Sequence, residues 1–405
     1  MNENWKKKII LFLTSQTISL FGSSLVQYAI SWYITLETKS GVMMTIAIIC
    51  GFLPTFFLSP FAGVWADRYN RKRLILISDS TIALATLVIA ILFLMGYKSI
   101  WLLFVVSVVR ALGTAVQTPT VGALIPQLVP EDKLTKVNAA NGSIQSMVML
   151  VSPMLSGALL TMAPMEIIFF IDVVTAAVAV STLLLFLKVP SHEKALAKQS
   201  VSYLGDMTEG YRYIKNHAFV RKIIIYSALF SFLAAPAAFL TPLQVTRSFG
   251  DQVWRLTAIE IVFSVGMILG GILMASWGGF KKKIHSMVTA TVAMGVGTFA
   301  LGIAPVFWLY LLMMSLIGLA MPLFNTPFTV LLQQKVEADY LGRVFGVFGM
   351  ASSIMMPAGM LVFGPLSDAV RIEWLLLGTG VLIFLEGFVM LADRVLKKVE
   401  SIDAK

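Results

Sequence analysis

The 405-residue chain is 58% hydrophobic and only 13% charged, whereas an ordinary soluble domain is about 25% charged. Its mean hydropathy is +0.86, so most of its surface must contact something other than water, and a water-soluble fold is excluded. The net charge of +10 does not indicate a nucleic-acid-binding protein. Its basic residues form short clusters between apolar runs, which is typical of loops at an anionic membrane face.

Apolar segments long enough to cross a bilayer recur along the whole chain. A transmembrane helix needs about 20 mostly apolar residues. Segments that meet this need lie at roughly 9–36, 44–66, 74–95, 99–123, 140–162, 165–187, 220–246, 254–277, 284–303, 306–332, 344–369 and 373–393. The break from Gly302 to Pro305 divides 284–332 into two spans. The sequence therefore predicts an all-α membrane protein with twelve transmembrane helices, arranged as two pseudo-symmetric six-helix bundles.

The basic residues separate between the two ends of the predicted spans. Clusters such as Lys6–Lys8 and Lys281–Lys283 fall in loops on the side of the N-terminus. The opposite loops hold only Lys39, Lys98, Arg247, Arg255 and Arg371. Because basic loops stay in the cytoplasm, we expect a multi-pass protein with both chain termini in the cytoplasm.

The longest polar stretch separates two halves that resemble each other. We expect an N-terminal six-helix bundle over 1–188, a cytoplasmic linker with a surface helix over 189–219, and a C-terminal six-helix bundle over 220–405. An ordered series of Thr-Pro, Gln, Val, Glu and Asp occurs twice, beginning at Thr118 and at Thr326. Internal repeats of this kind are typical of secondary transporters.

The stretch GVWADRYNRKR, from Gly63 to Arg73, carries the most specific motif. It resembles the glycine–aspartate–arginine–basic signature between helices 2 and 3 of the major facilitator superfamily. Glycine permits close helix approach, and a charge network at a helix end can hold one conformation and release in another. We predict a conformational latch made of Gly63, Asp67, Arg68, Arg71 and Lys72. A positive-inside anchor without any latch is the alternative.

Arg110 lies in the middle of the fourth span, where a charge costs about 2.5–3.5 kcal/mol on insertion scales. It must therefore face a partner or a wet cavity. The sequence from Arg110 to Gly113 resembles the superfamily's helix-4 signature, which is associated with proton coupling. A structural arginine bonded to backbone carbonyls is the alternative. In the fifth span, Pro153 and Gly157 resemble a degraded form of the helix-5 antiporter signature, which implies export.

Acidic residues inside spans are candidates for handling protons or substrate. Such acids occur at Asp79, Asp172, Glu260 and Glu386. We predict that Arg110, Glu260 and Asp172 form the proton-coupling site, with Glu260 the first choice. A pair between Glu260 and Arg255 near the outer surface is the alternative for Glu260. For the other three acids, Asp172, Asp79 and Glu386, a hydrogen bond between helices is the favoured interpretation.

The resemblance to the superfamily also implies a central cavity lined by helices 1, 4, 7 and 10. Polar residues recur at helical spacing in the first span, and a polar stripe on an apolar helix turns away from lipid. We predict that the substrate cavity includes Gln16, Ser23, Gln27 and Asn325. Hydrogen bonds between neighbouring helices are the alternative role for these side chains.

Short stretches in order along nearly the whole chain resemble the bacterial macrolide-efflux (Mef-type) branch of the superfamily. Examples are Gly51–Pro54, Leu134–Lys136 and Tyr340–Phe345. The resemblance implies an antiporter of the bacterial cell membrane that exports hydrophobic drugs, macrolide antibiotics first, in exchange for protons by alternating access. It thereby implies antibiotic resistance. The alternatives are a transporter of a native metabolite, lipid or siderophore, and a membrane scaffold that transports nothing.

No enzyme motif is evident in the sequence. It contains no G-x-S-x-G, no phosphate-loop lysine motif and no H-E-x-x-H. We therefore expect no catalytic residues, no metal and no cofactor. The expected partners are a small hydrophobic drug, protons and the lipid bilayer, with no nucleic acid, and the protein is expected to be a monomer.

Overall fold

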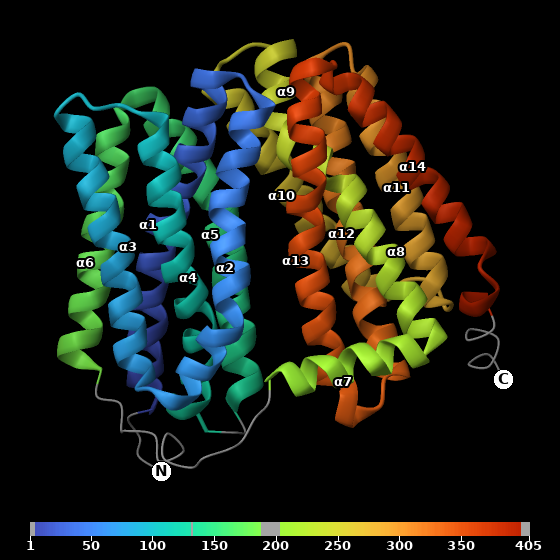
Figure 1. Cartoon of the computed structure of the whole chain (residues 1–405), viewed down its shortest axis with the longest axis horizontal. Helices are drawn as coiled ribbons and strands as arrows, with labels where there is room; N and C mark the ends of the chain where they lie inside the picture. The colour runs from blue at the N-terminus through green and yellow to red at the C-terminus, as the bar shows by residue number, and fades with distance from the viewer. Residues whose placement is uncertain (1–4, 131–132, 188–202, 398–405) are drawn as a thin grey trace. The chain divides into compact units, whose positions relative to one another are not determined.

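The computed structural model describes residues 5–130, 133–187 and 203–397. Within these residues the chain is nearly all helical, and twelve helices are long and apolar enough to cross a membrane (Figure 1). This confirms the predicted fold class. The predicted division of 284–332 is also present, because α11 (Lys283–Ile303) ends before α12 (Phe307–Lys335) begins.

The first of two compact units comprises Met1–Glu37 and Ile46–Gln199. Its spans belong to α1 (Trp5–Thr38), α2 (Gly41–Arg68), α3 (Arg71–Leu94), α4 (Ile100–Leu128), α5 (Leu134–Met162) and α6 (Met165–Phe186). Short connections make successive helices antiparallel neighbours. Helix α3 packs against both α4 and α6, which brings three spans together around one interior.

The second unit comprises Thr38–Thr45 and Ser200–Lys405. Its first complete helix is the amphipathic α7 (Tyr203–Asn216), which lies in the polar stretch expected to hold a surface helix. Its other elements are α8 (Ala218–Ala235), η3 (Pro236–Leu240), α9 (Thr241–Ser248), α10 (Val253–Trp277), α11, α12, α13 (Ala338–Ala369) and α14 (Ile372–Ala392). The bundle boundaries predicted at 188 and 219 stay predictions.

Helix α10 lies very close to α12, and small residues explain why. A Cβ added at Gly266 or Gly270 would lie 2.2 Å from a backbone oxygen of α12, and one added at Gly318 would lie 2.2 Å from the carbonyl oxygen of Phe263. Small residues let membrane helices approach until their backbones touch, and the gain is in van der Waals contact. The second unit therefore has a tightly packed helix pair independent of any polar contact.

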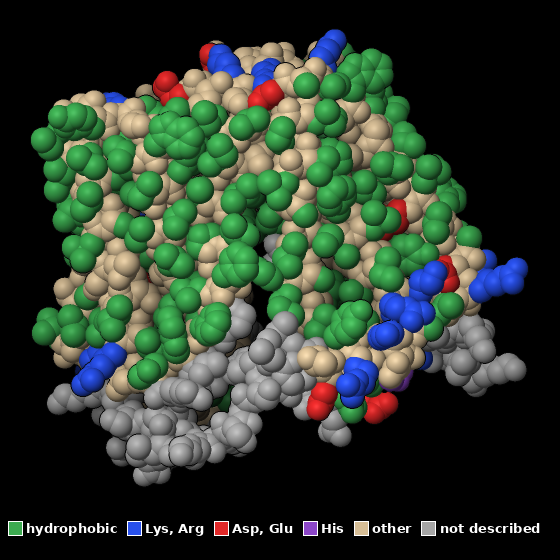
Figure 2. All heavy atoms as spheres, viewed as in Figure 1, with side chains coloured by type: hydrophobic (Ala, Val, Ile, Leu, Met, Phe, Trp, Pro, Cys, Tyr) green, Lys and Arg blue, Asp and Glu red, His purple; other side chains and the backbone are tan. Residues whose placement is uncertain are grey.

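On the face shown in Figure 2, apolar side chains cover most of the described surface of each unit, and charged side chains gather towards the helix ends. Leu84, Val105 and Leu185 are 61%, 61% and 71% exposed. Such exposure on helices that are also apolar inside is expected where the surrounding solvent is lipid. The surface therefore fits a multi-pass membrane protein.

Candidate functional site

Arg110 of α4 and Asp172 of α6 form an ion pair in the interior of the first unit. Arg110 Nη1 lies 2.5 Å from Asp172 Oδ2, and the two side chains are 6% and 0% exposed. A buried pair is costly unless its remaining polar atoms are hydrogen-bonded. The sequence required a partner for Arg110, and the structure places an acid from 62 residues further along the chain against it.

Two further helices complete the shell of the pair. Thr86 of α3 accepts a hydrogen bond from Arg110 Nη1 at 2.6 Å, and its hydroxyl lies 3.0 Å from Asp172 Oδ2. Ser23 of α1 donates to Asp172 Oδ1 at 3.2 Å, and its carbonyl accepts from Arg110 Nη2 at 2.9 Å. Arg110 Nε is buried without a partner among the described residues. The pair therefore joins α1, α3, α4 and α6, and the arginine bonds both an acid and a backbone carbonyl.

Two glycines allow these helices to come close enough for the pair to form. A Cβ added at Gly22 would lie 2.0 Å from Thr175 Oγ1 and 3.1 Å from Asp172 Oδ1. A Cβ added at Gly113 would lie 2.5 Å from the side chain of Ile82 on α3. The glycine that follows the arginine in the helix-4 signature thus has a packing reason in this chain.

A second buried polar cluster lies along the same helices. Asp79 of α3 is 2% exposed, and its Oδ1 accepts hydrogen bonds from Gln117 Nε2 at 2.5 Å and from Ser19 Oγ at 3.3 Å. Gln117 lies seven residues after Arg110 on α4, which is about two helical turns. The cluster and the ion pair therefore share α1, α3 and α4.

The structure separates the four residues predicted for the substrate cavity. Gln16 is 8% exposed and its Oε1 lies 3.4 Å from Gln117 Nε2, so it joins the Asp79 cluster. Ser23 belongs to the ion pair, as described above. Gln27 on α1 and Asn325 on α12 are exposed and lie in neither group. Their place in a cavity stays a prediction.

The helix-5 residues lie against α1. Pro153 and Gly157 are buried in α5, and Ser156 between them donates to the carbonyl of Leu25 at 3.0 Å. Ser152, directly before Pro153, is fully buried, and its hydroxyl has no partner among the described residues. This segment therefore fixes α5 to α1 by a hydrogen bond at Leu25. Leu25 lies two residues after Ser23, which contacts the ion pair.

The predicted latch is described only in part. Three of its five residues, Gly63, Asp67 and Arg68, lie outside the residues whose contacts the structure describes. Arg71 donates to the carbonyls of Ala66 and Ala123, each at 2.8 Å. Lys72 donates to the carbonyl of Leu187 at 2.7 Å. These two cations thus satisfy carbonyls at the ends of α2, α4 and α6, where positive charge is favourable.

Glu260, the acid predicted first for proton coupling, lies on α10 in the second unit and is half-buried. The predicted alternative, a pair with Arg255, does not form among the described residues. The Arg255 guanidinium instead lies over the rings of Trp254 and Phe307, at 5.5 Å and 5.6 Å. Glu386 of α14 is 4% exposed, and neither carboxylate oxygen has a partner among the described residues. It therefore does not make the predicted hydrogen bond between helices.

Sequence reasoning missed two residues of the site, Thr86 and Gln117. Gln117 had a usable signal, because a glutamine two turns from Arg110 on the same helix lies on the same face. Thr86 had none, because threonine is common in spans and usually bonds its own helix backbone. It does that here as well, since its hydroxyl lies 3.0 Å from the carbonyl of Ile82.

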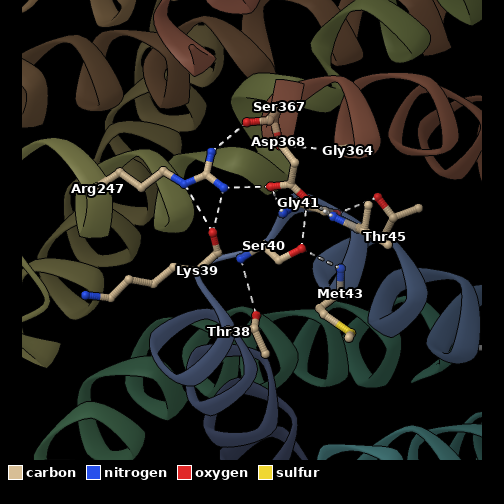
Figure 3. A network of polar contacts seen from close by, with 11 residues as sticks. Thr38, Lys39, Ser40, Gly41, Met43, Thr45, Arg247, Gly364, Ser367 and Asp368 are labelled. Atoms are coloured by element: carbon tan, nitrogen blue, oxygen red, sulfur yellow. Dashed lines mark hydrogen bonds and ion pairs between the residues drawn. The ribbon is translucent and has the colours of Figure 1, made fainter. Parts of the chain in front are cut away.

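A polar network around Asp368 of α13 holds the start of α2 (Figure 3). The Asp368 carboxylate accepts from the backbone N–H groups of Gly41 at 2.7 Å and Val42 at 3.0 Å, and from Ser40 Oγ at 2.7 Å. Arg247 of α9 pairs with the same carboxylate at 2.6 Å. A carboxylate at a helix N-terminus is favourable because the first N–H groups have no partner in the helix.

Comparison with known proteins identifies relatives over nearly the whole chain. The family model described as Major Facilitator Superfamily matches residues 12–360. A protein described as macrolide efflux protein A, from Streptococcus pyogenes, is 30% identical over 382 residues, which cover 94% of this chain and 94% of that protein.

Solved transporters share the fold at low sequence identity. A mutant form of the nucleoside transporter NupG matches with a TM-score of 0.72 and 14% identity, over 96% of this chain and 99% of that chain. A bacterial homologue of the human lysosomal transporter Spinster matches with a TM-score of 0.71 and 14% identity, over 98% of each chain.

Proposed function

Because the chain belongs to the major facilitator superfamily of membrane transporters, we propose that it exports hydrophobic drugs, macrolide-type antibiotics first, in exchange for protons. The substrate class is supported by the similarity to macrolide efflux protein A over 94% of the chain. Proton exchange is supported by the buried pair of Arg110 and Asp172, which is the observation that carries the proposal. We place the protein in the bacterial cell membrane as a monomer, with both termini in the cytoplasm.

The ion pair suits a coupling role because its charges are compensated inside the bundle. A proton that reaches Asp172 would remove the negative charge and leave Arg110 uncompensated, which is costly in a buried setting. The four helices that meet at the pair would then favour a different packing. Binding and release of a proton at this point can thereby bias a two-state transporter.

The other predicted residues take supporting roles in this proposal. Glu260 is the second coupling acid, on the other half of the chain, and Gln27 and Asn325 contribute polar contacts to the substrate cavity. Gln16 and Ser23, also predicted for the cavity, support the two buried acids of the first unit, since Gln16 belongs to the Asp79 cluster and Ser23 bonds Asp172. The segment with Pro153 and Gly157 serves the export direction. Gly63, Asp67, Arg68, Arg71 and Lys72 act as the conformational latch.

Expression in a macrolide-sensitive bacterium tests the proposed function. We expect raised macrolide tolerance and lower accumulation of a radiolabelled macrolide, both abolished by a protonophore, because the proton gradient drives export. Cells with the empty vector are the control. Unchanged tolerance to several macrolides at confirmed expression would contradict the proposed substrate class and favour a native metabolite, lipid or siderophore.

Glu260→Gln is expected to reduce proton-driven export more than it reduces substrate binding, because glutamine keeps the size of the side chain but cannot release a proton. The measurement compares macrolide affinity with pH-driven uptake in proteoliposomes. Asp251→Asn is the matched control, since Asp251 lies just before α10 with its side chain 64% exposed. Equal coupling in Glu260→Gln and wild type would reduce Glu260 to a structural acid.

A further inference from the structure

We propose that Asp79 is a proton-carrying acid of the transport cycle, distinct from the acid of the Arg110–Asp172 pair. The proposal rests on the proposed proton exchange and names a further residue that performs it. Asp79 lies inside α3, is 2% exposed, and faces α1 and α4. The sequence placed Asp79 among the candidate acids but favoured a hydrogen bond between helices for it.

Asp79 and Asp172, the acids of the two buried polar groups of the first unit, differ in their partners. Both oxygens of Asp172 are occupied, Oδ1 by Ser23 and Oδ2 by the Arg110 guanidinium and Thr86. Asp79 has no cation, and its Oδ2 is buried without a hydrogen-bond partner among the described residues. A buried carboxylate with neither a cation nor a full set of donors is costly. A proton on Oδ2 removes that cost.

The residues around Asp79 suit proton transfer rather than an ion pair. Those that contact its Oδ1, Ser19 and Gln117, are neutral. Gln16 brings a further amide next to Asp79, and its buried Nε2 makes no hydrogen bond of ordinary distance and angle among the described residues. Two polar atoms that lack partners in one buried cluster mark a place where a water or a proton completes the hydrogen bonds.

Among the described residues, one charged group acts on Asp79 from a helix packed against α3. Asp172 on α6 lies near enough for its charge to act on Asp79, and Arg110 on α4 binds Asp172. Helix α1 contributes only neutral side chains to the cluster. A change of charge at Asp79 therefore changes the electrostatic energy of the ion pair. Through the pair, a proton on Asp79 can influence the packing of the four helices.

The proposed step is a simple proton exchange. The ionised carboxylate accepts a proton from hydronium on Oδ2, forming one O–H bond and releasing water. In the other state of the cycle, the acid returns the proton to water. Gln117 binds Oδ1 in both forms, so the cluster keeps its contact with α4 while its charge changes.

Asp79→Asn is the direct test in proteoliposomes. Asparagine keeps an oxygen for Gln117, so we expect macrolide binding and substrate exchange without a gradient to persist. Substrate-driven proton flux should fall to the level of protein-free liposomes, and the pH dependence of transport should flatten. A purely structural role predicts that asparagine preserves coupling, and that result would overturn the proposal. Thr81→Val is the matched control, because Thr81 is an exposed residue of α3 that bonds only its own helix.

Carbodiimide labelling of the wild-type protein keeps the proposal testable if the variant does not fold. Carbodiimides react with protonated carboxyl groups in apolar surroundings, and mass spectrometry locates the adduct. We expect labelling at Asp79 that is lost at high pH and reduced by substrate. Absence of label at Asp79 in active protein would overturn the proposal. If wild-type protein itself moves macrolide without protons, the proposed function fails instead, so the two failures can be told apart.

Discussion

Arg110→Gln is expected to abolish proton-driven transport and to destabilise the protein by about 3–5 kcal/mol, which is typical when one partner of a buried ion pair is removed. The loss arises because Asp172, which is fully buried, is left without its cation. Thermal unfolding in detergent measures the stability, and macrolide export measures the function. Arg110→Lys should recover only part of the stability. Lysine restores a positive charge beside Asp172, but its single ammonium lacks the planar fork with which arginine bonds Thr86, Asp172 and the Ser23 carbonyl together.

The double variant Arg110→Gln with Asp172→Asn separates stability from transport. Both charges are gone, so the desolvation cost of an unpaired ion disappears and most of the lost stability should return. Transport should not return, because the site can no longer bind and release a proton. Wild-type export by this double variant would show that the pair is only a structural contact.

Asp368→Ala is expected to destabilise the second unit by about 2–3 kcal/mol, because several charge-assisted hydrogen bonds are lost together. The variant leaves the N–H groups of Gly41 and Val42 without their acceptor and leaves Arg247 without its carboxylate. Water replaces part of this, since the Asp368 side chain is 28% exposed. The measurement is thermal unfolding, supported by amide hydrogen exchange at the start of α2, which should become faster.

A nearby exposed pair is the control for this prediction. Lys39 and Asp251 lie 3.1 Å apart, with side chains that are 48% and 64% exposed. Ion pairs as open as this contribute little, so Asp251→Ala should leave unfolding and exchange unchanged. If Asp368→Ala is equally silent, the carboxylate does not stabilise the start of α2.

The spans could be predicted from the sequence because the bilayer imposes a length and an apolar composition on each of them. Helix ends could not, since helices continue past the apolar core. Helix α1 begins at Trp5 and includes Lys6–Lys8, whose long side chains can reach the interface from within a helix. The seventh span also contains the π-helical turn η3 at Pro236–Leu240, where the proline lacks the N–H that a regular helix needs.

The need for a partner at Arg110 could be predicted, but the identity of that partner could not. A mid-membrane cation must be compensated, and four acids, Asp79, Asp172, Glu260 and Glu386, lie more than one helical turn from the ends of the spans. Only the fold decides that Asp172 of α6 meets Arg110 of α4, with Gly22 permitting the approach of α1. The same limit applies to Asp79. Among the described residues no cation bonds its carboxylate, and this depends on which helices pack against α3, not on the sequence around Asp79.

Helical spacing was an incomplete guide to the predicted cavity residues. Gln16, Ser23 and Gln27 recur on one face of α1, yet the first two lie in buried polar groups and Gln27 is exposed. Helical spacing shows that residues share one face of a helix. It does not show which neighbouring helix covers that face at each position along the helix. The environment of each residue therefore had to come from the structure.

Proton flux in liposomes that contain only the purified protein is the most direct test of proton-coupled export. With a pH-sensitive dye trapped inside and no other energy source, addition of a macrolide outside should discharge an imposed pH gradient, at a rate that depends on the macrolide concentration. Arg110→Gln should give no signal. Macrolide movement without any change in internal pH would contradict proton coupling.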